Sequence, residues 1–485
     1  MKKLFTLLLA LSLLFVTGCS TQPRQAVSQQ DTASRPEGFL VGYCEVVINP
    51  TESLPLEGYT NEETRYFKEI GDNIKASVIA MADGLGNDIL IVNTDFMLIR
   101  ASFGDPLQQA ISLETGIPEE RIYISSNHSH SAPYISSTNP KVVAYREKTI
   151  EDITAAAASA LADLQPATMY TGSVETENLN FVKHYSYVDE NGQTQYFGDN
   201  FGTAVYNETT DHVGQADPTM HLVRFERQDG KDVILTNWRA HPHFTGGSTK
   251  YVLSADYIGA FREVLSRQTD AHVVYLQGAC GNINSSSRLN IEEQADDHRA
   301  FGALLAGYAA EGLKNNLSQV QTGQIKTMYY EFYGQIDRTA DSIYLQAQQA
   351  WTVWKQTNSW EECETYMTPY GIRSPYHALA ITQKHNYADA DGKITMNAVS
   401  IGETFSFVTF PGEMFDTLSV GIEEGSPFAS TMFIGYSSGH VGYLASAYGH
   451  EYTCYETDVS RFMPGTGEQV QQEYIRMLNE LKEGA

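Results

Sequence analysis

Short apolar runs alternate with longer amphipathic stretches from Phe39 onward, and this alternation constrains the fold more than any other feature of the sequence. Apolar runs bounded by turn residues indicate buried strands, whereas stretches of helix formers with apolar residues about three or four positions apart indicate helices. The pattern predicts strands over 76–81, 89–93, 121–125, 221–226, 233–238 and 273–276, and helices over 106–115, 149–164 and 256–267. We therefore expect an α/β fold, in which helices flank a mixed sheet, as one large domain over 38–485.

The segment 342–368 has a different composition, helical in pattern but rich in Gln, Trp and Glu. It could form an inserted helical hairpin near the mouth of a site, or a peripheral packing element. Long surface segments between core elements are usually structural, which favours the packing interpretation.

The N-terminus has the pattern of an export signal. Met1-Lys2-Lys3 precedes an apolar run that is too short for a stable membrane-spanning helix, and Thr17-Gly18-Cys19 follows it. This resembles a bacterial lipobox and predicts a lipoprotein signal peptide over 1–18, lipidation of Cys19 and a flexible tether over 19–37. We expect an exported protein anchored through Cys19 to the outer side of a bacterial membrane, at the cell surface or in the periplasm. A plain secretory signal with an incidental cysteine is the alternative.

Acidic residues dominate the charge. The chain has 32 Lys plus Arg against 59 Asp plus Glu, a formal net charge of -27. Such a field repels phosphate backbones, so we expect no nucleic acid partner.

Cysteine usage is sparse beyond Cys19. Cys44, Cys280, Cys363 and Cys454 contain no C-x-x-C pair, so a zinc–thiolate site is not indicated. An oxidising exterior would permit one or two disulfides among them.

Two histidine clusters each follow a predicted strand. The first is the run 127–133, Asn-His-Ser-His-Ser-Ala-Pro, with His128 and His130 two positions apart, and the second is the run 237–243, which contains His241 and His243. Residues two apart on a strand point the same way, and His-x-His is a metal-ligand spacing of moderate specificity. Two polar loop histidines are the alternative for such a motif taken alone.

Acidic and phenolic groups follow other predicted elements. The strand 405–410 leads into Pro411-Gly412-Glu413, and His440, Tyr443 and Tyr455 lie further along the chain. A lone Glu or Tyr is more often a solvated or packing residue. In open α/β sheets, however, ligands bind beyond the carboxyl ends of strands, so these groups and the histidines are consistent with one site.

Taken in order, these motifs resemble those of the neutral/alkaline non-lysosomal ceramidase family, in its N-terminal catalytic domain. The family's runs His-Thr-His-Ser-Gly-Pro, Val-His, Gln-Ser-Asn, Pro-Gly-Glu, Gly-Tyr and Tyr-Glu-Gly correspond here to 128–133, 240–241, 277–282, 411–413, 442–443 and 455–456. The correspondence extends from about Phe39 to Tyr455, nearly the whole predicted mature chain.

The resemblance implies a Zn²⁺ site and a metallohydrolase domain over 38–485. The ligands would be His128, His241, Glu413 and Tyr443, with His440 in reserve if Tyr443 is out of register. Two imidazoles, a carboxylate and a phenol oxygen form a plausible shell that leaves room for a water. Zinc would activate that water for attack on a carbonyl.

Two further roles follow from the same resemblance. His130 would lie beside the metal, where a protonated imidazole could donate to the tetrahedral oxygen or to the leaving amine. Tyr455 would hydrogen-bond the developing oxyanion.

The expected reaction is hydrolysis of an amide bond in a small-molecule or lipid N-acyl substrate, ceramide-like in type. The substrate-binding positions Gly278 and Lys183 depart from the family: Gly278 stands where the family has a serine, and Lys183-His184 stands where related chains often have two arginines. Ceramide itself is therefore less expected than another N-acyl compound. For Lys183 and His184 a solvated face is the commoner position.

Two alternatives use the same fold. A metal-dependent esterase or phosphoesterase would keep the metal, but a phosphoester would need an Arg or Lys clamp, and none clusters at the motifs. A non-catalytic, ligand-binding surface lipoprotein would be expected to lose a metal ligand. All four ligand positions hold competent residues, which favours the enzyme.

Overall fold

The computed structural model describes residues 38–59, 62–198, 206–246, 249–286, 289, 297–452 and 454–484, all within one structural unit, Pro36–Ala485. The predicted signal peptide over 1–18, the lipidation site Cys19 and the tether over 19–37 lie outside the described residues.

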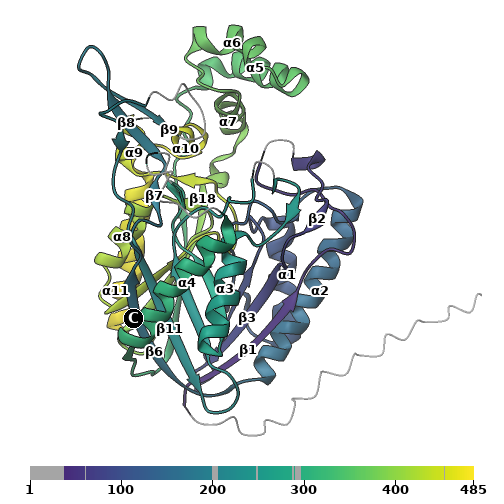
Figure 1. Ribbon diagram of the computed structural model, residues 1–485, viewed down its shortest axis with the longest axis vertical. Helices are drawn as coiled ribbons and strands as arrows, with labels where there is room; N and C mark the ends of the chain where they lie inside the picture. The colour runs from purple at the N-terminus through teal and green to yellow at the C-terminus, as the bar shows by residue number, and fades with distance from the viewer. Residues whose placement is uncertain are drawn as a thin grey trace, which may run out of the picture. The chain divides into compact units, whose positions relative to one another are not determined.

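The central sheet is mixed and joins strands that are far apart in the chain (Figure 1). Over the described residues its order is β14-β12-β11-β6-β1-β3-β4-β5, and β16 pairs with β6. The strands are β1 (Leu40–Val47), β3 (Lys75–Ala82), β4 (Ile89–Thr94), β5 (Ile122–Ser126), β6 (Gln165–Glu175), β11 (Thr219–Arg227), β12 (Val233–Trp238), β14 (His272–Gln277) and β16 (Ser318–Gln319). The β4–β5 and β12–β14 pairs are parallel and the other pairs are antiparallel.

This sheet is bent rather than open. β5 and β14 end its strand order, yet β14 contacts both β4 and β5. The bend occurs where β1 and β6 share only a two-residue register, Leu40↔Pro166 and Val41↔Gln165. The polar segments after β5 and after β12 can therefore approach each other although their strands are far apart in the sheet order.

A second sheet packs into the bend. Its order is β17-β18-β19-β21, with strands β17 (Ile325–Tyr333), β18 (Lys393–Ile401), β19 (Phe405–Thr409) and β21 (Ser430–Ile434). Val41 and Leu235 of the large sheet share one buried apolar cluster with Phe407 and Ile434 of the second sheet. The alternation of inward apolar residues along these strands explains why the two faces bury each other.

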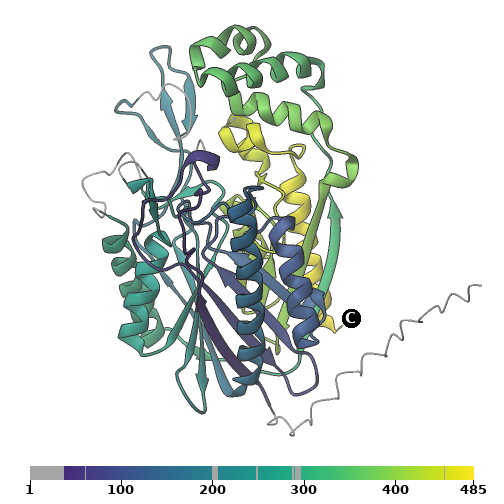
Figure 2. The ribbon, with the colours of Figure 1, turned by 90° about the vertical axis from the view of Figure 1, so that its right-hand side faces the viewer.

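Helices cover the outer faces of both sheets (Figures 1 and 2). On the large sheet these are α1 (Ala101–Thr115) and α2 (Pro140–Ala162) over one half and α3 (Asp256–Thr269) and α4 (His298–Asn315) over the other. On the second sheet they are α8 (Asp416–Glu424) and α11 (Thr466–Glu483). The predicted α/β fold, a mixed sheet flanked by helices, is confirmed, and the second sheet adds a layer that the sequence pattern did not predict.

Local capping signals set the helix starts. The Asn139 side chain accepts a hydrogen bond from the Lys141 N–H, and Pro140 occupies the first turn of α2. α2 therefore begins nine residues before the predicted start at 149, because the cap precedes the alanine-rich run. The Asp297 side chain caps α4 in the same way, by accepting from Arg299 and Ala300 N–H.

A helical cap stands apart from the two sheets (Figure 1). It consists of α5 (Tyr344–Thr357), α6 (Trp360–Met367) and α7 (Pro375–Asn386), so the segment 342–368 is helical as predicted. The cap has its own small apolar core, which includes Ala347, Ala350, Cys363 and Ile381.

Two further features concern the thiols and the helices. Cys44, Cys280, Cys363 and Cys454 are all free, so the disulfides that export would permit are not formed. Over the part of the chain that the structure describes, no helix combines the length and apolar character that crossing a membrane requires.

Burial of His377 in the cap predicts a pH-dependent stability. Its Nδ1 accepts the Arg373 N–H at 3.2 Å, and burial lowers the pKa of His377 from its ordinary 6.5 to about 4, with Asp458 partly offsetting this. The unfolded chain binds the extra proton between these values, so stability is lost as the pH falls through that window. Between pH 7 and pH 5 we expect the free energy of unfolding of wild type to fall by about 2 kcal/mol more than that of His377→Gln. Urea unfolding at both pH values measures this, and equal losses in the two proteins would contradict it.

Candidate metal centre

His128 and His130 lie just beyond the end of β5, where the backbone leaves the extended conformation. His128 has a φ of 64°, so the two side chains meet through a left-handed turn and not through the strand alternation expected from their spacing. The Nε2 atoms of the two rings lie 3.3 Å apart. The two imidazoles lie close together, as predicted. A left-handed turn at His128 brings them together, and the predicted alternation along a strand does not.

His241 follows β12 and reaches the same point from the other half of the bent sheet. Its ring centroid lies 4.9 Å from that of His128. Burial, with a further contribution from the nearby Lys183, lowers the pKa of His241 to about 4, so the imidazole is neutral at physiological pH.

Backbone carbonyls fix the tautomers of all three rings. The Nδ1–H groups of His128, His130 and His241 donate to Met97 O at 3.0 Å, Gly58 O at 2.8 Å and Ile283 O at 3.0 Å. Each Nε2 is therefore left with a free lone pair, and these atoms all lie within 4.8 Å of one another. Such outer hydrogen bonds to Nδ1 orient histidines that bind metals through Nε2.

Glu413 completes this arrangement from the second half of the chain. Its Oε2 lies 3.4 Å from His128 Nε2 and 3.6 Å from His241 Nε2, and it has no hydrogen-bond partner among the described residues. A buried carboxylate oxygen without a proton donor marks a place for a cation.

The separations fit a tetrahedral metal ion. Zinc bonds of about 2.0–2.1 Å to N and O ligands place neighbouring ligand atoms about 3.3 Å apart. Glu413 in β20 (Glu413–Met414) is the register partner of Tyr443 in the parallel strand β22 (Tyr443–Leu444), so the phenol is held beside the carboxylate. The residues present therefore fit Zn²⁺.

His440, the reserve ligand, lines the same cavity as His241 and Glu413. Burial lowers its pKa to about 3, with Arg100 adding to the effect, and its Nδ1 is buried without a hydrogen-bond partner among the described residues. The in-register pairing of Tyr443 with Glu413 nevertheless favours Tyr443 as the fourth ligand.

His130 is a neutral group. Burial is the main cause that lowers its pKa well below the ordinary value, and its Nδ1–H is committed to Gly58 O. Its bare Nε2 can therefore accept a proton first, and the expected donation from a protonated His130 stays a prediction.

Lys183 and His184 form a buried ionic cluster with Glu456. Lys183 Nζ lies 2.8 Å from one carboxylate oxygen of Glu456 and His184 Nε2 lies 2.7 Å from the other. Both side chains are almost fully buried, so the predicted solvated face is wrong: Glu456 compensates for the burial of the charge. Lys183 also lies 5.6 Å from the Tyr443 ring centroid.

The site opens into a cavity of about 990 Å³. Its inner wall includes His130, His241, Glu413, Tyr443 and Tyr455, which brings together most of the predicted site residues. The cap supplies an opposite wall through Trp351, Trp354, Tyr376 and Tyr387.

Two predictions about the surroundings are corrected by this cavity. The segment 342–368 is not a peripheral packing element, because Trp351 and Trp354 line the cavity. Gly278 does not belong to the cavity wall: its N–H donates to Trp238 O at 2.7 Å, and a Cβ there would meet Arg239 and Trp238 at 3.1 Å. Close backbone packing explains the glycine.

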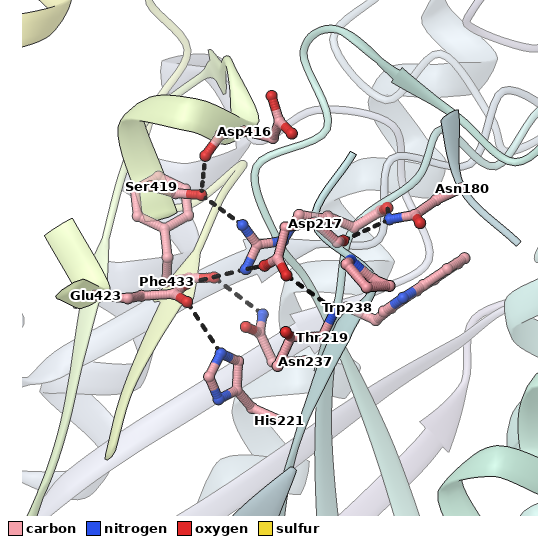
Figure 3. Close-up of polar contacts among 12 residues, drawn as sticks. Asn180, Asp217, Thr219, His221, Asn237, Trp238, Asp416, Ser419, Glu423 and Phe433 are labelled. Atoms are coloured by element: carbon pink, nitrogen blue, oxygen red, sulfur yellow. Dashed lines mark hydrogen bonds and ion pairs between the residues drawn. The ribbon is translucent and has the colours of Figure 1, made fainter. Parts of the chain in front are cut away.

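A buried arginine fixes the segment that carries His241. Arg239 donates to Ser419 Oγ at 2.9 Å and pairs with Asp217 and Glu423, each at 3.0 Å. Figure 3 shows Ser419 and Glu423 of α8 facing Asp217, which precedes β11, with His221 bonded to Glu423. The end of β12 is thereby held against α8.

Comparison with known proteins gives a fold likeness only. No protein-family model and no curated protein sequence matches the chain. A crystal structure of neutral ceramidase from Pseudomonas aeruginosa is similar, with a TM-score of 0.67 and 16% identity over 92% of this chain and 75% of that one. A structure described as a ceramidase complexed with C2 has a TM-score of 0.66 and 16% identity, over 92% and 76%. The chain has a neutral ceramidase-like fold.

The Arg239 network predicts a large stability effect. Arg239→Met leaves the partly buried carboxylates of Asp217 and Glu423 without their shared guanidinium, with His221 still beside Glu423, so we expect the free energy of unfolding to fall by about 3 kcal/mol. Arg476→Met, which removes exposed pairs on α11, is the matched control and should cost no more than about 1 kcal/mol. Urea unfolding of both variants measures the difference, and similar small losses would show that the network does not secure β12.

Proposed function

We propose that this chain is a zinc-dependent hydrolase that cleaves the amide bond of an N-acyl substrate with water as the nucleophile. The observation that carries the proposal is the buried Oε2 of Glu413, which accepts no hydrogen bond from the described residues and lies 3.4 Å and 3.6 Å from the Nε2 atoms of His128 and His241. His128, His241, Glu413 and Tyr443 would hold the metal. The solved structures that share the fold are described as ceramidases, which supports an amide as the bond.

Bound zinc lowers the pKa of a water molecule and polarises the scissile carbonyl. His130 Nε2, beside His128, accepts the proton that the water loses as its oxygen bonds to the carbonyl carbon. The same nitrogen returns that proton to the amide nitrogen as the C–N bond breaks, so the amine leaves neutral and a carboxylic acid remains, which then loses its own proton to solvent. Amide nitrogen is a poor leaving group, which is why this proton delivery matters.

Tyr455 stabilises the negative oxygen of the tetrahedral intermediate. It lines the cavity, and its ring lies 6.0 Å from that of Tyr443. Burial raises the pKa of Tyr455 above its ordinary value, so the phenol keeps its proton and can donate it in a hydrogen bond.

The alternatives fit the cavity less well. Arg100 and Lys183, two of the cations in its wall, are already paired with Glu57 and Glu456 at 2.7 Å and 2.8 Å, so these two do not form a phosphate clamp. A binding protein without catalysis would not need an unsatisfied buried carboxylate at the centre of three oriented histidines.

Metal content and turnover test the function together. Elemental analysis of wild type should give about one zinc per chain, and amine should be released from an N-acyl panel that includes ceramide, with esters and phosphomonoesters alongside. His241→Ala should lose both zinc and hydrolysis. Tyr455→Phe is the matched control: it should keep zinc while kcat falls by about 10²–10³-fold. Absence of zinc and of turnover after adding metal would favour a binding lipoprotein, and cleavage of the esters or phosphomonoesters alone would favour the second enzyme class.

We also propose that the chain acts outside the cytoplasm, anchored through a lipid on Cys19, as the pattern of residues 1–19 suggests. A fatty-acid label supplied to expressing cells should appear on wild type and be absent from Cys19→Ala. A labelled Cys19→Ala protein, or an unlabelled wild type, would refute the anchor.

A further inference from the structure

Five cationic side chains line the substrate cavity, and three of them have carboxylate partners. The cations are Arg100, Lys183, Lys355, Lys384 and Arg461. The ion pairs are Arg100–Glu57 at 2.7 Å, Lys183–Glu456 at 2.8 Å and Lys384–Asp337 at 3.0 Å. Lys355 and Arg461 have no carboxylate within 4.0 Å among the residues that the structure describes.

Arg461 is held in place although it is not neutralised. Its Nη1 donates to the backbone carbonyl of Asp391 at 3.1 Å, and its guanidinium carbon lies 4.8 Å from the Tyr387 ring centroid. The Asp391 carboxylate is engaged elsewhere, because its Oδ2 accepts the Ala388 N–H at 2.7 Å. One edge of the guanidinium is therefore fixed by the protein, while no carboxylate oxygen of the described residues forms an ion pair with it and Asp391 acts on its charge only from a greater distance.

Lys355 differs from Arg461 in its exposure to solvent and in the orientation of its charged group. Its side chain is exposed on α5, and its Nζ lies 6.0 Å from the Trp351 ring centroid. Water therefore solvates the Lys355 charge, and its ammonium is not oriented by a hydrogen bond among the described residues. Arg461 is only partly exposed, and burial is the main cause that lowers its pKa.

A partly buried, oriented guanidinium without a partner is suited to a ligand anion. The planar fork of arginine matches a carboxylate in a bidentate pair, and stacking on an aromatic ring leaves the edge donors available.

We propose that Arg461 binds an anionic group of the substrate, so that the N-acyl compound cleaved by this chain carries a carboxylate, unlike the uncharged ceramide. The inference rests on the proposed function and names its substrate class. The apolar part of such a substrate can pack against Trp351, Trp354 and Leu379 of the cap. The carboxylate can belong to the amine part, as in an N-acyl amino acid, or to the acyl part, as in the monoamide of a dicarboxylic acid.

The experiment compares acids with their uncharged esters. Wild type is assayed with N-lauroylglycine and its methyl ester, with lauric acid release as the readout, and with N-dodecylsuccinamic acid and its methyl ester, with dodecylamine release as the readout. Wild type should prefer the acid in one of these pairs, and that pair identifies which part carries the charge. In Arg461→Gln the ratio of kcat/KM for the acid to that for the ester should fall by about 10- to 100-fold, mainly through KM.

Two further variants separate recognition from folding and from net charge. Arg461→Lys keeps the charge over Tyr387 but not the fork, so it should retain part of the preference. Arg476→Gln removes the same unit of charge from the surface of α11 and should leave the ratio as in wild type. Thermal melting of each variant shows whether it is folded.

The outcomes distinguish this inference from the proposed function. If wild type cleaves neutral amides but shows no preference for either acid, or if Arg461→Gln leaves the preference intact, the inference is overturned and the hydrolase stands. If wild type cleaves no amide, the proposed function fails, and calorimetry with the two acids decides the inference alone. Binding that is lost in Arg461→Gln then supports an anion site, and absent or unchanged binding overturns it.

Discussion

The site depends on three hydrogen bonds that carry no catalytic role of their own. The Nδ1–H groups of His128, His130 and His241 end on backbone carbonyls, and this leaves three bare Nε2 atoms in a buried space. Without those carbonyls the rings could rotate and hydrogen-bond one another or Glu413. With them, the Oε2 atom of Glu413 has no hydrogen-bond donor among the described residues, and a cation can satisfy it.

Buried ion pairs hold the chain segments next to His241 and Tyr455. Arg239, two residues before His241, is held by carboxylates from two other elements, and Glu456, next to Tyr455, is held by Lys183 and His184. Each pair lies at the end of an element that carries a site residue. Because a buried charge is costly without its partner, these contacts allow one arrangement of the element ends. The cap then adds aromatic and cationic groups that the sheets do not provide, which separates the metal chemistry from the choice of substrate.

The sequence by itself determined the fold class, the strands that precede the candidate site and, through the resemblance, which residues to consider as metal ligands. Apolar periodicity is local, so the strands before His128 and His241 could be read directly from it. The order of the motifs, which resembles the ceramidase family, also indicated Glu413 and Tyr443. Local signals could not show that Lys183 is buried, since its compensating carboxylate, Glu456, lies 273 positions away in the chain.

Only the tertiary structure decided how these pieces meet. The strands before His128 and His241 lie far apart in the sheet order, and they approach because the sheet bends and a second sheet fills the bend. The tautomers depend on carbonyls of distant segments, and the role of the cap depends on Trp351 reaching the cavity. Long-range packing selects these contacts, and neither the composition nor the apolar periodicity of the sequence contains information about that packing. The residue types that can bind a metal, in contrast, follow from the chemistry of their side chains.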